Sequence, residues 1–247
     1  MNKTAIIIPS RLDAQRFPNK PLKLINNKEM ILHVYDAAIK SNTGEVYVAT
    51  PDDKIIDIVK NSGGKAIKTS LNHETGTDRI FEVFKQTLKE EPKIIINLQG
   101  DMPNIEPQAI SNLVSYMNNG KCDIGTLASD FNSRNEIDDP NAVKVAVKEK
   151  FSKNTFLNAY DFFRTSTNST YNLYHHIGIY AFTNEALLRY VSLKRSKLEL
   201  ERKLEQLRAL ENNMSIHVGY IKSSPLSVDT EEDLTEAKNL MEKNEQN

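Results

Sequence analysis

Three cations follow the first apolar run of the chain. The segment IIIPSRLDAQRFPNKPL (residues 6–22) places Arg11, Arg16 and Lys20 in a loop that contains no glycine. Arginine binds two phosphate oxygens at once through its planar fork, and lysine adds a mobile point charge. Prolines restrict the backbone of the same segment. The spacing predicts that this loop binds a phosphate chain such as a triphosphate, and the alternative is a solvated loop with unconnected cations.

A further cation lies at the predicted start of a helix. The segment HETGTDRI (residues 73–80) predicts a turn, then a helix that Thr77 caps and that carries Arg79 in its first turn. The positive end of the helix dipole disfavours a cation there, so Arg79 indicates an anionic partner. The free N–H groups of the first turn can also bind an anion. The alternative is an ion pair of Arg79 with Asp78 or Glu82.

Two carboxylates, far apart in the sequence, are candidates for one metal ion. Asp101 follows the most apolar predicted strand, residues 93–99, and Asp229 precedes the last predicted helix. Magnesium is bound by one or two carboxylates together with substrate phosphates. The alternatives are ordinary ones: aspartate is common in turns after strands. Asp229 could also be part of a helix cap, since Thr230 and Asp233 have the spacing of a capping box.

The second half of the chain carries polar residues suited to a sugar. His176 and Tyr180 lie in a predicted strand, and Glu205 and Gln206 lie in a predicted charged helix over residues 197–212. Charged helical residues are usually a solvated face. Periodicity does not say which of them points inward, so both interpretations of the helix stay open.

The elements that would position these residues alternate between strand and helix. Strands are predicted at residues 6–8, 45–50, 65–69, 93–99 and 123–128, and helices at 30–39, after Asp52, after Thr77 and from Pro107. This repetition predicts an α/β fold with a doubly wound, mostly parallel sheet. Ligands of such sheets bind outside the carboxyl ends of the strands, where the strand order reverses. The candidate residues follow strands in this way.

The second half is less regular. Strands are predicted at residues 141–147, 175–182 and 215–221, and the last helix at Thr230–Glu242. We interpret residues 121–195 as an excursion of strands and helices that contributes to the sugar site and to self-association. The expected organisation is a single domain over residues 1–247.

Composition excludes several classes of function. The 247 residues have a net charge of −1, which leaves no broad basic face for nucleic acid and no polybasic patch for a membrane. One cysteine, Cys122, excludes an internal disulfide and a thiolate zinc cluster. No export signal or apolar run of membrane-spanning length is present, so we expect a cytoplasmic protein.

Together these motifs resemble the CMP-Kdo synthetases, the 3-deoxy-manno-octulosonate (Kdo) cytidylyltransferases. The matching segments occur in the same order: IIIPSRLDAQRFPNKPL, HETGTDRI, NLQGDMP, DPNAVKVAV, HHIGIYAF, LEQLRALEN and VDTEEDL. The pairing of HIGIY with LEQLR favours the Kdo branch over sialic acid activation. Three features depart from the family pattern: Met102 replaces an acidic residue, Ser227 replaces a glycine, and residues 148–174 match poorly.

The resemblance implies a nucleotide-diphospho-sugar transferase-like fold, a homodimer, and the Mg²⁺-dependent reaction of CTP with Kdo to CMP-Kdo and pyrophosphate, for lipopolysaccharide biosynthesis. It implies that CTP is bound by Ser10, Arg11, Lys20, Gly76, Thr77 and Asp101. The sugar acid would be surrounded by Arg79, Gln99, His176, Tyr180, Glu205 and Gln206. Asp101 and Asp229 would hold the metal, and the catalytic residues would be Arg11, Lys20, Asp101 and Asp229.

Two other functions remain open at this point. One is a cytidylyltransferase for 8-amino-Kdo or for another ulosonic acid such as sialic acid. The other is a non-catalytic CTP-binding regulator, against which the presence of both Asp101 and Asp229 argues.

Overall fold

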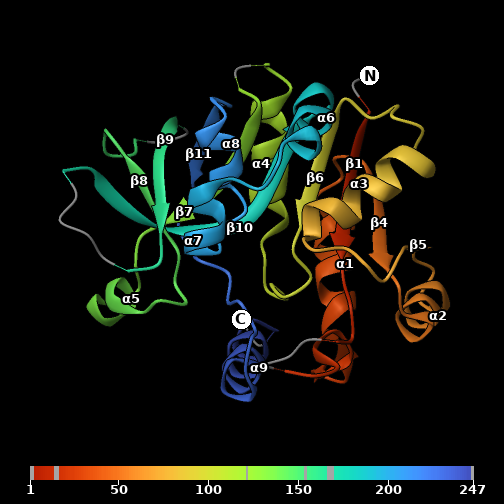
Figure 1. Cartoon of the computed structure of the whole chain (residues 1–247). Coiled ribbons are helices and arrows are strands. Elements are labelled where there is room, and N and C mark those ends of the chain that lie inside the picture. Colours follow the sequence, from red (N-terminus) through yellow and green to blue (C-terminus); the bar gives the residue numbers. More distant parts are fainter. Residues whose placement is uncertain (1–2, 14–16, 121, 153–154, 166–169, 246–247) are drawn as a thin grey trace. The chain divides into compact units, whose positions relative to one another are not determined.

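The computed structural model describes residues 3–13, 17–120, 122–152, 155–165 and 170–245 (Figure 1). Arg16 lies outside these residues. The chain forms two compact units: Met1–Asn112 with Pro225–Asn247, and Leu113–Ser224. The second unit is wider than the predicted excursion, and the single domain stays a prediction. No helix in the described ranges is both long and apolar enough to span a membrane.

The first unit contains a parallel sheet. The strands of that sheet are β1 (Thr4–Pro9), β4 (Glu45–Thr50), β5 (Ala66–Lys68) and β6 (Ile94–Leu98), while β2 (Leu24–Ile25) and β3 (Lys28–Glu29) form a separate antiparallel pair. Its helices are η1 (Lys20–Leu22), α1 (Met30–Lys40), α2 (Asp53–Asn61), α3 (Gly76–Gln86) and α9 (Glu231–Glu245), and α4 (Pro107–Met117) continues into the second unit. The buried isoleucines of β1 and β6 explain why these two apolar runs form strands at the core.

The order of the parallel strands in this unit is β5-β4-β1-β6. From β1 the chain first adds strands on one side and then returns to the other side of β1 with β6. The strand order therefore reverses between β1 and β6. The residues directly after these two strands, Ser10 and Gln99, lie where ligands of such sheets bind.

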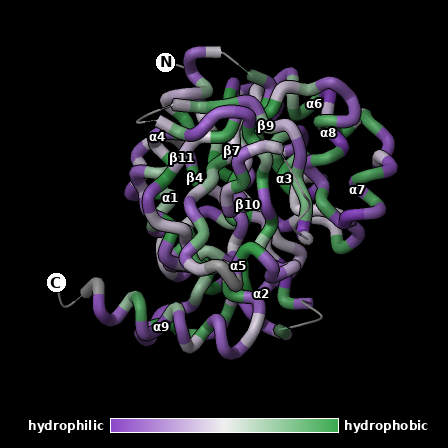
Figure 2. Tube along the Cα trace, turned by 90° about the vertical axis from the view of Figure 1, so that its left-hand side faces the viewer, coloured by the Kyte–Doolittle hydropathy of each residue, from purple (hydrophilic) through white to green (hydrophobic). Residues whose placement is uncertain are grey.

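The last helix is tied to the first loop by a small apolar core. Val228 and Leu234 pack with Phe17, Ile25 and Met30, and all five side chains are buried. Apolar and polar residues alternate along α9, as expected for a helix that packs on one side (Figure 2). This core brings Asp229 to Lys20, although the two residues are 209 positions apart.

The second unit has mainly antiparallel strands: β7 (Ile124–Ser129), β8 (Lys144–Val147), β9 (Phe156–Phe163), β10 (Asn172–Thr183) and β11 (Ile216–Tyr220). They pair in a closed sequence β7-β11-β9-β8-β10-β7, in which only β11 and β7 are parallel. β8 and β9 are an antiparallel pair, and the described residues between them form no helix, which fits the short connections that such pairs allow. The expectation of mostly parallel strands therefore holds in the first unit and is wrong in the second.

The helices of the second unit differ from the sequence prediction. They are α5 (Arg134–Asp138), α6 (Asn184–Ser192), α7 (Lys197–Arg202) and α8 (Leu207–Glu211). The single helix predicted over residues 197–212 is two short helices. Lys203 ends the first of them in a left-handed conformation with φ of 55°. A break at this position gives the residues after it a fixed, non-helical path.

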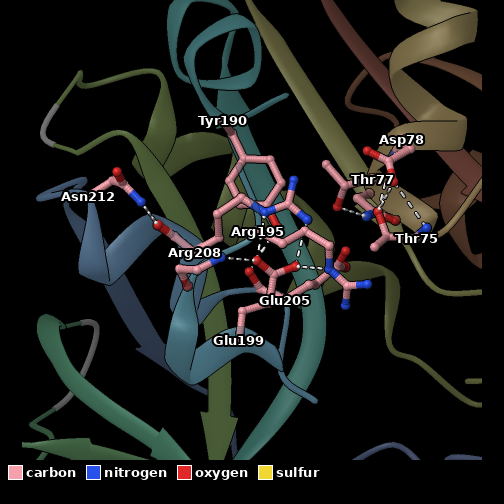
Figure 3. A network of polar contacts seen from close by, with 11 residues as sticks. Thr75, Thr77, Asp78, Tyr190, Arg195, Glu199, Glu205, Arg208 and Asn212 are labelled. Carbon is pink, nitrogen blue, oxygen red and sulfur yellow. Dashed lines mark hydrogen bonds and ion pairs between the residues drawn. The ribbon is translucent and has the colours of Figure 1, made fainter. Parts of the chain in front are cut away.

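The start of α3 also differs, because Thr75 caps this helix and Thr77 does not. The Thr75 Oγ1 accepts a hydrogen bond from the Asp78 N–H at 3.2 Å, and the Asp78 carboxylate accepts one from the Thr75 N–H at 3.1 Å (Figure 3). This reciprocal pair is a capping box. It places Gly76 and Thr77 inside the first turn of the helix.

Replacing Thr75 with alanine is expected to lower the free energy of unfolding by about 1 kcal/mol, the usual effect of losing a helix cap. Urea denaturation of the two proteins measures the difference. Thr75→Ser keeps the oxygen and is the matched control. Equal losses for the alanine and serine variants would show that the hydroxyl does not cap the helix.

Candidate functional site

A cavity of about 290 Å³ in the first unit opens where the strand order reverses. Seven predicted site residues line it: Ser10, Arg11, Lys20, Gly76, Arg79, Gln99 and Asp101. They come from the ends of β1 and β6, from η1 and from α3. The topology therefore explains why segments distant in the sequence contribute to one cavity.

Lys20 lies between the two carboxylates that were predicted to hold a metal. Its Nζ is 3.2 Å from Asp101 Oδ2 and 2.9 Å from Asp229 Oδ1. Burial alone would lower the pKa of Lys20, but Asp101 and Asp229 outweigh this effect and the pKa is raised. The alternative of a solvated, unconnected cation is therefore wrong for Lys20, since only 14% of its side chain is exposed and two carboxylates bind it. Arg11, in contrast, is exposed.

The cap at the start of α9 does not use the Asp229 side chain. Asp233 Oδ2 accepts hydrogen bonds from the Asp229 N–H at 2.9 Å and the Thr230 N–H at 2.8 Å. Thr230 Oγ1 accepts one from the Asp233 N–H at 3.2 Å. Thr230 and Asp233 therefore cap the helix, which leaves the Asp229 carboxylate directed to Lys20.

The carboxylate pair has a donor set that fits magnesium. Two carboxylates that converge on one cation, beside a cavity lined by further cations, are what Mg²⁺ needs when a substrate supplies phosphate oxygens. No cluster of three or more His, Cys, Asp or Glu side chains in the described residues offers a complete protein cage. A metal here therefore depends on ligands from a bound substrate and from water.

Ser10 and Gly76 both line the cavity. The Ser10 N–H donates to the Ala49 carbonyl at 2.9 Å, while its buried Oγ has no hydrogen-bond partner among the described residues. A buried hydroxyl without a partner at a cavity indicates a ligand. A Cβ on Gly76 would lie 3.3 Å from Pro9 and 3.4 Å from the Gln99 amide, so a larger residue would crowd the wall.

Arg79 is buried at the cavity, and the hydrogen bonds of its guanidinium go to uncharged groups. Its Nη1 donates to Thr69 Oγ1 at 2.6 Å and to the Ser70 carbonyl at 2.9 Å. Among the described residues it forms no ion pair, so the alternative of a pair with Asp78 or Glu82 is wrong; both carboxylates have other partners. Burial and the nearby Arg11 lower the pKa of Arg79, although arginine stays protonated. Glu82 and Asp52 act on Arg79 only from a distance, and a buried cation without a direct ion pair favours an anionic ligand.

Thr77 and Gln99 are linked through Asn97, a residue that sequence reasoning missed. Asn97 is fully buried in β6, and its Nδ2 donates to Thr77 Oγ1 at 3.2 Å. Its Oδ1 accepts from Gln99 Nε2 at 2.8 Å. Thr77 does not line the cavity, and its role in the nucleotide pocket stays a prediction. Sequence reasoning also missed His73, Glu74 and Thr75, which do line the cavity, although the motif HETGTDRI contains all three.

The remaining predicted residues belong to the second unit, where they are mostly buried. His176 is 6% exposed and lies 2.9 Å from Thr126 Oγ1 through Nε2, and its ring centroid is 5.5 Å from that of Tyr180. Burial, followed by the charge of Glu205, raises the pKa of Tyr180. Gln206 is 5% exposed, and its Nε2 has no hydrogen-bond partner among the described residues. A solvated face is therefore wrong for Gln206.

The state of His176 predicts a pH dependence of stability. Complete burial, with the neighbouring His175, lowers the pKa of His176 from 6.5 to about 3. Between pH 6.5 and 3, His176 is protonated in the unfolded chain but neutral in the folded chain. The free energy of unfolding is therefore expected to fall as the pH falls through this range. In His176→Gln this slope should flatten, as measured by urea denaturation across that range. Identical slopes in both proteins would contradict the assignment.

Comparison with known proteins gives the family. Residues 5–216 match the family described as Cytidylyltransferase. The 3-deoxy-manno-octulosonate cytidylyltransferase of Brucella ovis is 42% identical over 238 residues, which are 96% of this chain and 94% of that protein. The chain belongs to the 3-deoxy-manno-octulosonate cytidylyltransferase family. The protein of the same name from Brucella anthropi is 42% identical over 241 residues, 97% of this chain and 96% of the relative.

Solved structures agree with this family membership. A CMP:2-keto-3-deoxy-manno-octonic acid synthetase complexed with CTP matches with a TM-score of 0.88 and 35% identity, over 98% of this chain and 99% of that chain. An apo UDP-glucose pyrophosphorylase matches with a TM-score of 0.71 at 13% identity, over 99% of this chain and 100% of that chain. The second likeness concerns the fold alone. The prediction of an α/β fold of the nucleotide-diphospho-sugar transferase type is confirmed.

Proposed function

We propose that this member of the cytidylyltransferase family activates Kdo, converting CTP and Kdo into CMP-Kdo and pyrophosphate. The observation that carries the proposal is the end-to-end likeness to 3-deoxy-manno-octulosonate cytidylyltransferases. The cavity supports it, since cations, a buried hydroxyl and two carboxylates lie together at the end of a parallel sheet. A regulator that only binds CTP would not need the carboxylate pair.

The reaction is a nucleotidyl transfer. The 2-hydroxyl oxygen of Kdo forms a bond to the α-phosphorus of CTP, and the bond from that phosphorus to the bridging oxygen breaks. Pyrophosphate leaves with the electron pair, and the hydroxyl proton passes to solvent. We assign Arg11 and Lys20 to the phosphates, where they stabilise the charge that develops on the leaving group. Ser10 supplies a hydroxyl to the nucleotide.

Asp101 and Asp229 would hold Mg²⁺ beside the α-phosphate. When bound, the ion supplies Lewis acidity, which favours loss of the hydroxyl proton and neutralises charge on the phosphate. The residues themselves orient the site: the carboxylates anchor Lys20, and Lys20 can turn to the phosphates of CTP when another cation replaces it. No nucleophile from the chain is assigned, because direct displacement needs none.

The sugar acid is assigned to six residues. Arg79 offers a cation for the carboxylate, and hydroxyls need the hydrogen-bonding groups that the others provide: Gln99, His176, Tyr180, Glu205 and Gln206. The finer features follow the family resemblance and are proposals as well: a doubly wound sheet, a homodimer, a cytoplasmic location, and a role in lipopolysaccharide biosynthesis.

Gln206→Ala is expected to raise the KM for Kdo about 10-fold while the KM for CTP changes less than about twofold, because one ligand hydrogen bond is lost. His176→Ala should act in the same direction. Steady-state pyrophosphate release, with each substrate varied in turn, measures both constants. Equal shifts for the two substrates would move these residues back to structural roles.

The proposed function is tested by pyrophosphate release from CTP in the presence of Kdo and Mg²⁺. Turnover with Kdo and little turnover with sialic acid or 8-amino-Kdo is the expected result. Faster turnover with 8-amino-Kdo would reassign the substrate within the ulosonic acids. Tight CTP binding without pyrophosphate release from any of the three acids would overturn the proposal.

A further inference from the structure

We propose that the buried ion pair of Glu199 and Arg208 is a positioning device for Gln206 in recognition of the sugar acid. The inference rests on the proposed function, because it assigns a role to residues that support the sugar-binding group. Glu199 is in α7 and Arg208 is in α8, and the segment between the two helices carries Glu205 and Gln206.

The ion pair closes this segment with two parallel hydrogen bonds. Arg208 Nε donates to Glu199 Oε2 at 2.9 Å, and Arg208 Nη2 donates to Glu199 Oε1 at 2.6 Å (Figure 3). Glu199 is 0% exposed and Arg208 is 3% exposed. Such a fork fixes direction as well as distance. Burial tends to raise the pKa of Glu199, but the hydrogen bonds from Arg208 and Ser196 outweigh it and lower the pKa, which keeps the pair charged.

Further contacts hold the segment itself. The Tyr190 hydroxyl donates to the Glu205 carbonyl at 2.8 Å, and the Arg208 guanidinium lies over the Tyr190 ring at 4.6 Å. Leu204 and Leu207, on either side of Glu205 and Gln206, are buried. The ion pair, the tyrosine and the two leucines therefore restrain the segment where α7 gives way to α8.

The segment carries a buried hydrogen-bond donor, the Gln206 side-chain amide, that has no partner among the described residues. Gln206 is 5% exposed, and its Nε2 finds no acceptor within the described part of the chain. An unpaired buried amide is unfavourable in the free protein, so its retention indicates that a ligand supplies the acceptor. The buried ion pair points the same way, because apolar residues of similar volume commonly stabilise a fold as well as a buried pair does. The role of the Glu199–Arg208 pair is therefore to fix the position of the segment that carries Gln206.

The test compares KM values in variants that remove the pair. Glu199→Met with Arg208→Met replaces both charges of the pair with apolar side chains, which commonly keeps a fold. It also releases Arg195, whose side chain is 40% exposed, and the Ser196 N–H, since both contact the Glu199 carboxylate. The KM for Kdo is expected to rise about 10- to 100-fold while the KM for CTP stays within about twofold, since a misplaced group loses orientation. Arg202→Ala, an arginine of α7 that contacts Asp161 instead, is the matched control and should leave both constants unchanged.

A double-mutant cycle gives the decisive readout. If the pair acts through Gln206, then Gln206→Ala should raise the KM for Kdo in the native chain but have almost no further effect in the Glu199→Met, Arg208→Met background. Additive effects on this KM, or a native KM in the double methionine variant, would overturn the inference. Single Arg208→Lys provides a second route if the double variant does not fold, with the same selective effect on Kdo expected. Failure of the native chain to turn over Kdo would instead overturn the proposed function.

Discussion

Replacing Asp229 or Asp101 with asparagine is expected to lower kcat at least about 10²-fold, the usual loss when one preorganised electrostatic element is removed. Both carboxylates converge on one position, where Lys20 Nζ lies within 3.2 Å of each. An amide keeps the shape but removes the charge that a divalent ion requires. Pyrophosphate release at saturating CTP, Kdo and Mg²⁺ measures the effect.

The double variant Asp101→Asn, Asp229→Asn should be little worse than either single variant, because both changes remove the same ion. EDTA should abolish the activity of the native chain. Thr230→Ala is the matched control: it removes part of the cap of α9, costs about 1 kcal/mol of stability, and should leave kcat unchanged. Near-native Mg²⁺-dependent turnover of Asp229→Asn would show that the ion does not need this carboxylate.

Arg11→Ala is expected to lower kcat/KM for CTP by about 30- to 1,000-fold, or about 2–4 kcal/mol of transition-state stabilisation. The side chain is exposed and lines the cavity, so its loss should not change the melting temperature. Turnover at low CTP is the measurement. Lys23→Ala removes a cation from the same part of the chain that does not line the cavity, and it should have no effect. Full turnover of Arg11→Ala at low CTP would remove this loop from the triphosphate site.

Lys20 should give a different result from Arg11. Lys20→Met leaves two carboxylates facing each other without a cation, so the ligand-free protein should gain affinity for divalent ions while CTP binding weakens. Titration with Mn²⁺, followed by electron paramagnetic resonance, reports the first effect without any turnover. Unchanged Mn²⁺ affinity would show that the lysine does not compete for the carboxylates.

Local patterns in the sequence predicted the strands that end at the cavity. The isoleucine runs of β1 and β6 are short, apolar and bounded by turn residues, so their type and their burial follow from composition alone. The carboxyl ends of parallel strands lie at one edge of an α/β sheet, so the residues that follow these strands lie close to the ligand. Arg11, Lys20 and Asp101 were found for this reason, whereas Gln99 was named only from the family resemblance.

The parts that sequence could not give depend on pairing across long distances. That Lys20 binds Asp101 and Asp229 is decided by the apolar core around Phe17 and Val228, and no local pattern encodes it. Arg79 finds a hydroxyl and a carbonyl instead of the neighbouring carboxylates, because His73 and the capping box already use those. Burial of Gln206 likewise depends on the path that the chain takes after Lys203.

The predicted helix and strand boundaries are wrong where two local sequence signals compete. Two threonines near Gly76 are equally good caps on paper, and the acidic residue three positions after Thr75 decides between them. Charged residues over 197–212 have strong helical propensity, which hides the break at Lys203. β9 was missed in the segment that departs most from the family pattern. Met102, another departure, is buried and does not line the cavity.

The order of residues along the chain has a consequence for synthesis on the ribosome. Lys20 and Asp101 are made first, and Asp229, the second carboxylate that Lys20 contacts, is made much later. Domains commonly fold as they emerge, from the N-terminus onward. The parallel strands of the first unit can therefore form before the Asp229 carboxylate is available to Lys20. Until Asp229 has been made, Lys20 has only one of its two carboxylate partners, so this contact forms only after residues 113–224 of the second unit have been synthesised.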